Sequence, residues 1–155
     1  MLIQLVWDRS GSMAECGKQL IARGIARAIE QYVRLGYVSA DLRLIAWGND
    51  ARVINWQPDQ EFPEELLLSE GSSSMQALVS LLGTNPDGRV LIITDGFWSP
   101  MDRKVLKRWK EGLRPDTARF IKVGADANPH MTGRNVFSAE DVFAVLDGWL
   151  EEGTE

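Results

Sequence analysis

The fold is decided by the stretch Leu2-Ile-Gln-Leu-Val-Trp7, which runs directly into Asp8-Arg-Ser10-Gly-Ser12. The first six residues are almost all apolar, as in a strand that is covered on both faces. Gly11 indicates a tight turn, so we expect the chain to leave this strand and bend while presenting one carboxylate and two hydroxyls. Oxygen donors without histidine or cysteine suit Mg²⁺ or Mn²⁺ and do not suit Zn²⁺.

Composition places the chain among ordinary globular proteins, with 45% apolar and 25% charged residues. We expect a single domain over residues 1–155, because this length can bury a core and no linker or repeat interrupts it. The net charge of −5 argues against a general affinity for nucleic acid or an anionic membrane. The one cysteine, Cys16, fits a reducing compartment and is expected to be a buried small residue on the first helix. With no signal peptide and no apolar run of transmembrane length, a cytoplasmic location is predicted.

Strand-like and helix-like patterns alternate along the whole chain. Apolar runs or alternation predict strands at residues 2–7, 41–47, 52–57, 89–94, 118–123 and 136–137. Helical spacing of apolar residues predicts helices at 18–35, 74–82, 102–113 and 139–152, the last with Ser138 as its N-cap. The acidic segment 58–70 is expected to be irregular, with at most one helical turn.

This alternation predicts an α/β domain in which a mostly parallel sheet lies between two layers of helices. The segment 52–57 is expected to be an antiparallel strand, linked by a hairpin to the strand before it. Ligands of such sheets bind at the carboxyl ends of the strands. Asp8 and Asp95 each follow a buried strand, so parallel strands would bring both carboxylates to one edge.

A third element is the loop Gly71-Ser72-Ser73-Ser74, which leads into a predicted helix and offers hydroxyls and backbone N–H groups. With Asp8-Arg-Ser10-Gly-Ser12 and Thr94-Asp95-Gly96, it makes the chain resemble the von Willebrand factor A (vWA) family. The metal-ion-dependent adhesion site (MIDAS) of that family is a D-x-S-x-S, Thr and Asp set on these three loops. The resemblance covers nearly the whole chain in element order and implies the Rossmann-like vWA fold.

The resemblance implies a metal site made by Asp8, Ser10, Ser12, Ser72 and Asp95. The family usually has Gly-Gly-Thr in the middle loop, where this chain has Gly71-Ser72-Ser73. Counting back from Ala77-Leu78 places Ser72 at the threonine position, and Ser73 is the neighbouring alternative. Ser10 and Ser12 suit direct contact with Mg²⁺, while Asp8 and Asp95 suit holding its water ligands.

For function, the resemblance implies that a carboxylate from another protein takes an open position on Mg²⁺ or Mn²⁺. Intracellular prokaryotic vWA proteins of this kind often act as adaptors beside AAA+ ATPases of the MoxR or chelatase type, or in stress and defence modules. Phe97, Trp98 and Ser73 are candidate partner contacts, although the loop with Trp98 is equally compatible with packing over the core. The basic run from Arg103 to Lys110 could steer an acidic partner or be a solvated helix face.

Other interpretations remain open. A metal-dependent hydrolase or phosphotransferase would suit the same edge of the sheet. Against it, the sequence shows no nucleophile beside a base, no second Asp two residues after Asp8, and no Lys after the Gly-Ser loop. The Asp and Ser residues could also be turn and cap residues in a purely structural domain. Asp50 and Asp126 also follow strands, where turn chemistry is the simpler role, and His130 is expected on a surface loop.

Overall fold

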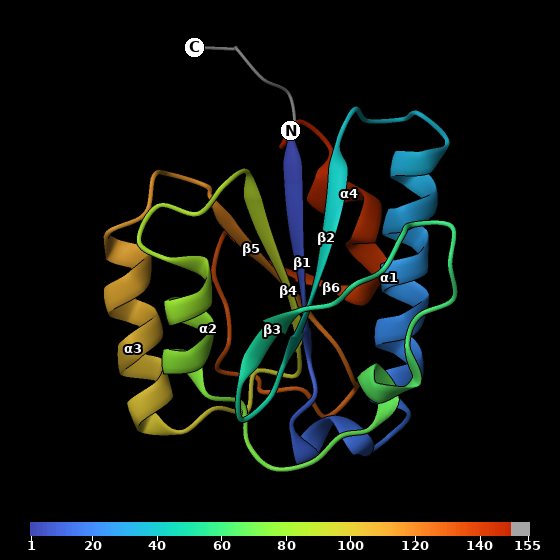
Figure 1. Cartoon of the computed structure of the whole chain (residues 1–155). Coiled ribbons are helices and arrows are strands. Elements are labelled where there is room, and N and C mark those ends of the chain that lie inside the picture. Colours follow the sequence, from blue (N-terminus) through green and yellow to red (C-terminus); the bar gives the residue numbers. More distant parts are fainter. Residues whose placement is uncertain (150–155) are drawn as a thin grey trace.

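The computed structural model describes residues 1–149, which form a six-stranded sheet between two layers of helices (Figure 1). The strand order is β3-β2-β1-β4-β5-β6. The strands are β1 (Leu2–Asp8), β2 (Asp41–Trp47), β3 (Ala51–Val53), β4 (Arg89–Thr94), β5 (Ala118–Lys122) and β6 (Val136–Ser138). Only β3 is antiparallel to its neighbour, and the other four pairs are parallel. The predicted mostly parallel sheet with an antiparallel edge strand is confirmed.

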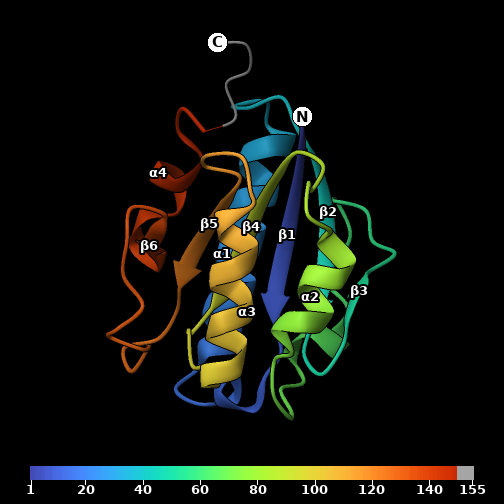
Figure 2. The same cartoon turned by 90° about the vertical axis from the view of Figure 1, so that its left-hand side faces the viewer.

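Helices cover both faces of the sheet. They are α1 (Lys18–Arg34), α2 (Met75–Leu82), α3 (Pro100–Glu111) and α4 (Val142–Leu146). Helices α1 and α4 lie on one face, and α2 and α3 lie on the other (Figures 1 and 2). Three short 3₁₀ turns are Gly11–Ala14, Glu64–Leu67 and Ala139–Asp141. The second of these is the one helical turn expected in the acidic segment.

Strand β1 lies near the middle of the sheet, and its side chains alternate between two cores. Ile3, Leu5 and Trp7 pack toward α1 and α4, whereas Val6 packs toward α2 and α3. This alternation follows from the two-residue period of a strand. Because both faces are covered, the strand is apolar almost throughout, which explains the nearly continuous apolar run in the sequence.

Local signals explain where two helices on the α2/α3 face begin. The Ser74 hydroxyl accepts a hydrogen bond from Ala77 N (3.2 Å) and caps α2. Ser99 caps α3 in the same way, accepting from Asp102 N (3.0 Å), with Pro100 in the first turn. Helix α3 therefore starts two residues before the predicted start, at a proline whose fixed φ suits this position.

Two expectations about the first half of the chain are wrong in detail. The predicted strand over 52–57 is shorter, because the chain leaves the sheet after Val53. Trp56 then stacks on Phe62 with ring centroids 5.0 Å apart, within the core on the α1 side. Cys16 is exposed and precedes α1, in a left-handed turn with a φ of 54°. It is therefore not a buried residue of the first helix.

The predicted helix over 139–152 is also wrong, because a 3₁₀ turn and the short helix α4 take its place. Asp147 is extended and Gly148 has a φ of 69°, which ends α4. Trp149 is buried, and its Nε1 donates to the Asp116 carbonyl at 2.6 Å. The Ser138 hydroxyl bonds the Asp141 carboxylate (2.9 Å) and caps no backbone N–H. Residues 150–152 of the prediction lie outside the described residues.

Between residues 1 and 149, no helix combines the length and the apolar character needed to cross a membrane.

Candidate metal site at the edge of the sheet

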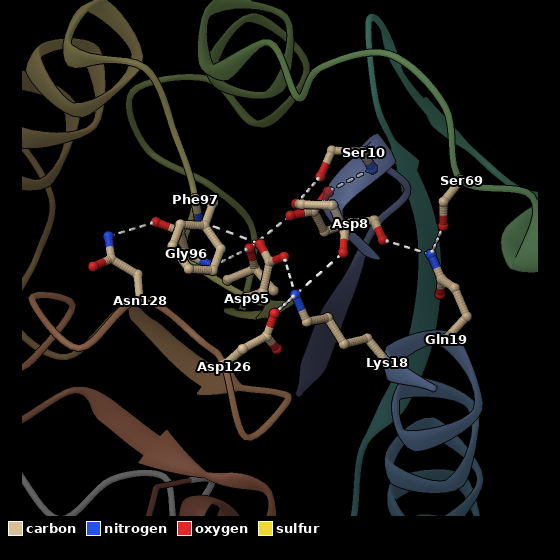
Figure 3. Close-up of polar contacts among 12 residues, drawn as sticks. Asp8, Ser10, Lys18, Gln19, Ser69, Asp95, Gly96, Phe97, Asp126 and Asn128 are labelled. Carbon is tan, nitrogen blue, oxygen red and sulfur yellow. Dashed lines mark hydrogen bonds and ion pairs between the residues drawn. The ribbon is translucent and has the colours of Figure 1, made fainter. Parts of the chain in front are cut away.

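The loops after β1 and β4 meet at one edge of the sheet. The two strands are parallel neighbours, with Trp7 opposite Ile93, so Asp8 and Asp95 lie at the same carboxyl edge. Both side chains are fully buried. Figure 3 shows them next to each other, with Lys18 of α1 reaching between the loops. The predicted convergence of these two carboxylates is confirmed.

Both oxygens of Asp8 are held by hydrogen bonds. Oδ1 accepts from Ser10 N (2.8 Å), and Oδ2 accepts from the Thr94 hydroxyl (2.6 Å). The bond from Thr94 joins the ends of β1 and β4, and Thr94 Oγ1 accepts in turn from Gly96 N (3.0 Å) in the loop after β4. Burial raises the pKa of Asp8 to about 6, although these hydrogen bonds act in the opposite direction. A nearby cation would favour the ionised carboxylate.

The hydroxyls of Ser10 and Ser12 lie side by side in the loop after β1, with their oxygens 3.3 Å apart. Ser10 is buried and Ser12 is partly exposed. The loop that carries them is joined to the Gly-Ser loop by two backbone hydrogen bonds, Gly11 N to Gly71 O (2.8 Å) and Glu70 N to Arg9 O (2.9 Å). Loops that are far apart in sequence are thus fixed against each other.

Ser72 and Ser73 have opposite surroundings. Ser72 is exposed, and both its N–H and its hydroxyl face the Asn49 side-chain oxygen (3.2 and 3.5 Å). Ser73 is buried, and its hydroxyl has no hydrogen-bond partner within residues 1–149. A buried hydroxyl without a partner is costly, so a ligand at this position would satisfy it. The surroundings therefore favour Ser73 over Ser72 as the third hydroxyl of a metal site.

Asp95 is held from two sides. Its Oδ1 accepts from Phe97 N (3.2 Å), and its Oδ2 accepts from Lys18 Nζ (3.0 Å). Gly96 lies between Asp95 and Phe97 and has a φ of 77°. A Cβ at this position would lie 2.5 Å from the Met131 sulfur. The turn that aims Asp95 therefore requires glycine.

Lys18 was not among the site residues expected from the sequence, and the structure buries it completely. Its ammonium group donates to Asp95 Oδ2 (3.0 Å) and to the Ser12 carbonyl (3.1 Å), and it pairs with Asp126 Oδ2 (3.1 Å). These three acceptors match the three donors of an ammonium group. Burial lowers the pKa of Lys18, but its bonds to the two aspartates outweigh burial and raise that pKa above its ordinary value. Lys18 thus balances charge at the edge of the sheet.

A second set of polar contacts holds the start of α1 against β1. Gln19 accepts from Trp7 Nε1 (2.6 Å) and donates to the Asp8 carbonyl (3.2 Å) and to Ser69 Oγ (2.6 Å). The bonds to Asp8 and Ser69 are visible on the right of Figure 3, and together the three bonds join α1 to β1 and to the loop at Ser69 through one buried amide. The sequence offered only the helical spacing of α1, which does not reveal this role.

The two aromatic candidates for partner contact differ in exposure. Trp98 is 9% exposed and packs near Trp47 and Phe120, with ring centroids 6.0 and 6.1 Å away. Phe97 is 45% exposed, and its ring centroid lies 5.4 Å from Lys18 Nζ. Two interpretations were left open for Trp98, a partner contact and packing over the core. Most of its side chain packs over the core.

We call Asp8, Ser10, Ser12, Ser73 and Asp95 the rim site. Its donors are carboxylate and hydroxyl oxygens, the ligands that Mg²⁺ and Mn²⁺ accept. Within residues 1–149 no three His, Cys, Asp or Glu side chains group as metal ligands, so a cation here would depend on the serines. The paired serine hydroxyls beside a buried carboxylate, and the unsatisfied Ser73 hydroxyl, fit such a cation.

Asp126 is connected to this site by its ion pair with Lys18. Asp50 is exposed at the β2–β3 turn. The sequence had raised both as possible edge residues. Thr94, Lys18 and Gln19 are the contacts that sequence reasoning missed. Thr94 was part of the motif Thr94-Asp95-Gly96, and its place at a strand end was the one signal that could have suggested it.

Comparison with known proteins gives a clear result for structure and none for sequence. No protein-family model and no curated protein matches this chain. One similar structure is the manganese-loaded TRAP protein of Plasmodium vivax. The match covers 97% of this chain and 73% of the TRAP chain, with 17% sequence identity and a TM-score of 0.62. Another is the SpRpn10 VWA domain, where the match covers 92% of this chain and 93% of that domain, with 14% sequence identity and a TM-score of 0.60.

A third structure, proximal thread matrix protein 1 from the mussel byssus with a zinc-occupied MIDAS motif, covers 94% of this chain and 44% of its own, with 15% identity and a TM-score of 0.54. At sequence identities this low, the structural matches show a shared fold and nothing further. The six-stranded, mostly parallel sheet with helices on both faces is therefore the Rossmann-like vWA fold.

Proposed function

We propose that this chain is a metal-dependent protein-interaction module that binds an acidic side chain of a partner through Mg²⁺ at the rim site. The observation that carries the proposal is the buried Asp8, with both oxygens fixed, directly beside the paired hydroxyls of Ser10 and Ser12. Similar folds that hold manganese or zinc support a divalent cation at this edge.

In this proposal Ser10, Ser12 and Ser73 supply neutral hydroxyl ligands, and Asp8 and Asp95 hold water ligands. Few direct anionic ligands leave the cation electrophilic, so it offers an exchangeable position to an incoming carboxylate. Lys18 neutralises part of the charge on Asp95 and fixes its direction. The chain would then act as an adaptor in the cytoplasm, in an assembly such as one built around an AAA+ ATPase of the MoxR type.

Partner capture tests this function directly. The protein is used as bait in lysate from its source cells, once with Mg²⁺ and once with EDTA, and retained proteins are identified by mass spectrometry. We expect a partner that is retained with Mg²⁺, lost with EDTA, and lost again with the Ser12→Ala bait. Equal retention in all three arms would refute a metal-bridged contact.

The hydrolase alternative is checked with the same variant. We expect no turnover of a generic phosphate ester with Mg²⁺ or Mn²⁺. Turnover that disappears in Ser12→Ala would replace the binding role with a catalytic one.

The two neighbouring serines provide a matched pair for the metal site itself. Ser73→Ala is expected to weaken Mg²⁺ binding by at least about tenfold, because it removes a buried hydroxyl that has no other partner. Ser72→Ala should leave Mg²⁺ affinity within about twofold, because its exposed hydroxyl faces Asn49. Isothermal titration calorimetry measures both. The reverse order of effects would return the ligand role to Ser72.

A further inference from the structure

The α2/α3 face of the sheet carries a groove that the rim site does not use. It is a cavity of about 770 Å³ between α3 and the loop over residues 123–135, and it begins at Gly96, next to Asp95. Its floor is apolar and consists of Trp98, Leu106, Phe120, Met131 and Val136. We call it the α3 groove. Its volume is in the range of ordinary ligand sites.

The topology explains why this surface is uncovered. The other connections between parallel strands pass through helices, namely α1 before β2, α2 before β4 and α3 before β5. The connection from β5 to β6, residues 123–135, contains no helix. In Figure 2 it runs beside α3 as an open loop. Parallel strands are usually buried on both faces, so the missing helix leaves the α3 side of β5 and β6 open.

The rim of the α3 groove is basic although the protein is acidic. Arg103, Lys107 and Lys110 line it from one face of α3, at a spacing of four and three residues, and outnumber the one acidic lining residue, Glu111. His130 lines it from the opposite loop. Neither lysine forms a salt bridge within residues 1–149. Burial lowers the pKa of Lys110, and its ammonium group lies 5.4 Å from the Phe120 ring centroid. The charge of the rim therefore favours an anionic ligand.

The floor of the groove contains an unsatisfied donor. Trp98 is 9% exposed, and its indole N–H has no hydrogen-bond partner among the described residues. Buried indole N–H groups normally find an acceptor. Trp98 lines the groove, so a carbonyl or carboxylate oxygen of a ligand that inserts beside its ring would supply one. This N–H is an observation independent of the basic rim, and both indicate acceptor oxygens in the ligand.

We propose that the α3 groove binds an extended segment of a partner protein that carries carboxylates and apolar side chains. The proposal rests on the proposed function, because the segment would continue from the carboxylate that reaches the rim site. The groove starts beside Asp95 and follows α3 from Arg103 to Glu111. Eight steps of about 1.5 Å give roughly 12 Å. An extended chain covers that length with about four residues at roughly 3.3 Å each.

Selection from a random heptapeptide library displayed on phage tests this binding site, with the whole chain as bait in Mg²⁺. We expect enriched peptides that combine Asp or Glu with apolar residues. The Lys107→Gln/Lys110→Gln variant should bind the enriched peptides at least about tenfold more weakly, measured by fluorescence anisotropy with synthetic peptides. The matched control, Lys104→Gln/Arg108→Gln, removes the same charge from exposed positions of α3 that do not line the groove. It should change affinity by less than about twofold.

A second variant tests the floor. Trp98→Phe keeps an aromatic ring and removes the indole N–H, so it should weaken the enriched peptides while leaving the melting temperature close to that of the wild type. No enriched peptide, or equal weakening by the groove and control variants, would overturn the proposal. Binding of naphthalene-2-carboxylate without any enriched peptide would make the occupant a small organic acid and would also overturn it. So would self-association that requires Lys107 and Lys110, which would make a second copy of the chain the occupant.

Repeating the peptide measurements in EDTA and with Ser12→Ala separates this proposal from the proposed function. Peptides that still bind, and still require Lys107 and Lys110, support the groove while the metal-bridged contact fails. Peptides that require Mg²⁺ but bind the groove variant as well as the wild type overturn the groove and leave the proposed function intact.

Discussion

Lys18→Met is expected to lower the free energy of unfolding by about 3 to 5 kcal/mol in metal-free buffer. The ammonium group of Lys18 is fully buried and bonds Asp95, which is also fully buried. Methionine fills a similar volume but carries no charge, so Asp95 would keep a buried negative charge without its partner. Removing one member of a buried ion pair costs much more than the pair itself contributes, because the remaining charge is still desolvated.

Urea unfolding in EDTA measures this effect. The control is Arg23→Met on the same helix, because Arg23 forms an exposed pair with Glu61 and should contribute less than about 1 kcal/mol. The double variant Lys18→Met/Asp95→Asn should recover most of the loss, since it removes the unpaired charge. A loss below about 1 kcal/mol for Lys18→Met, equal to that of Arg23→Met, would show that the pair contributes no more than a surface contact.

Much of the fold could be predicted because strands buried on both faces leave a strong signal. The runs Leu2–Trp7 and Arg89–Thr94 are apolar nearly throughout, and each is followed by an aspartate at the edge of the sheet. Once the strands are taken as parallel, the convergence of Asp8 and Asp95 follows from topology alone. The last helix could not be placed in this way. Its apolar spacing is helical, but Gly148 in a left-handed conformation and the burial of Trp149 end it early.

The contacts within the site were less predictable, because they depend on residues far apart in sequence. Lys18 stands at the start of an amphipathic helix, where a lysine is normally solvated. Its burial arises only when α1 meets the loop after β4, which brings Lys18 to Asp95, 77 positions away. The choice between Ser72 and Ser73 likewise depends on Asn49. Its side chain accepts a hydrogen bond from Ser72, whereas the Ser73 hydroxyl is buried without a partner among the described residues.

Asp8→Asn is expected to change stability in a direction that depends on pH. Burial raises the pKa of Asp8 in the folded protein to about 6, above its ordinary value of 3.8. Below about pH 3 the carboxyl is protonated in both the folded and unfolded states, and this group opposes folding least. As the pH rises toward 6, the unfolded chain loses the proton while the folded protein keeps it. The wild type therefore loses stability through this window.

The expected size of this loss is about 3 kcal/mol between pH 3 and pH 7, since the two pKa values differ by about two units and each unit corresponds to about 1.4 kcal/mol. Asparagine cannot ionise, so Asp8→Asn should gain about this much relative to the wild type over the same range, measured by urea unfolding in EDTA. Groups that titrate in both proteins cancel in the difference. A difference that stays constant with pH would show that Asp8 ionises in the fold as readily as in the unfolded chain. With Mg²⁺ at pH 7 the order should reverse, because the ionised Asp8 carboxylate then holds the cation's ligands and asparagine does so poorly.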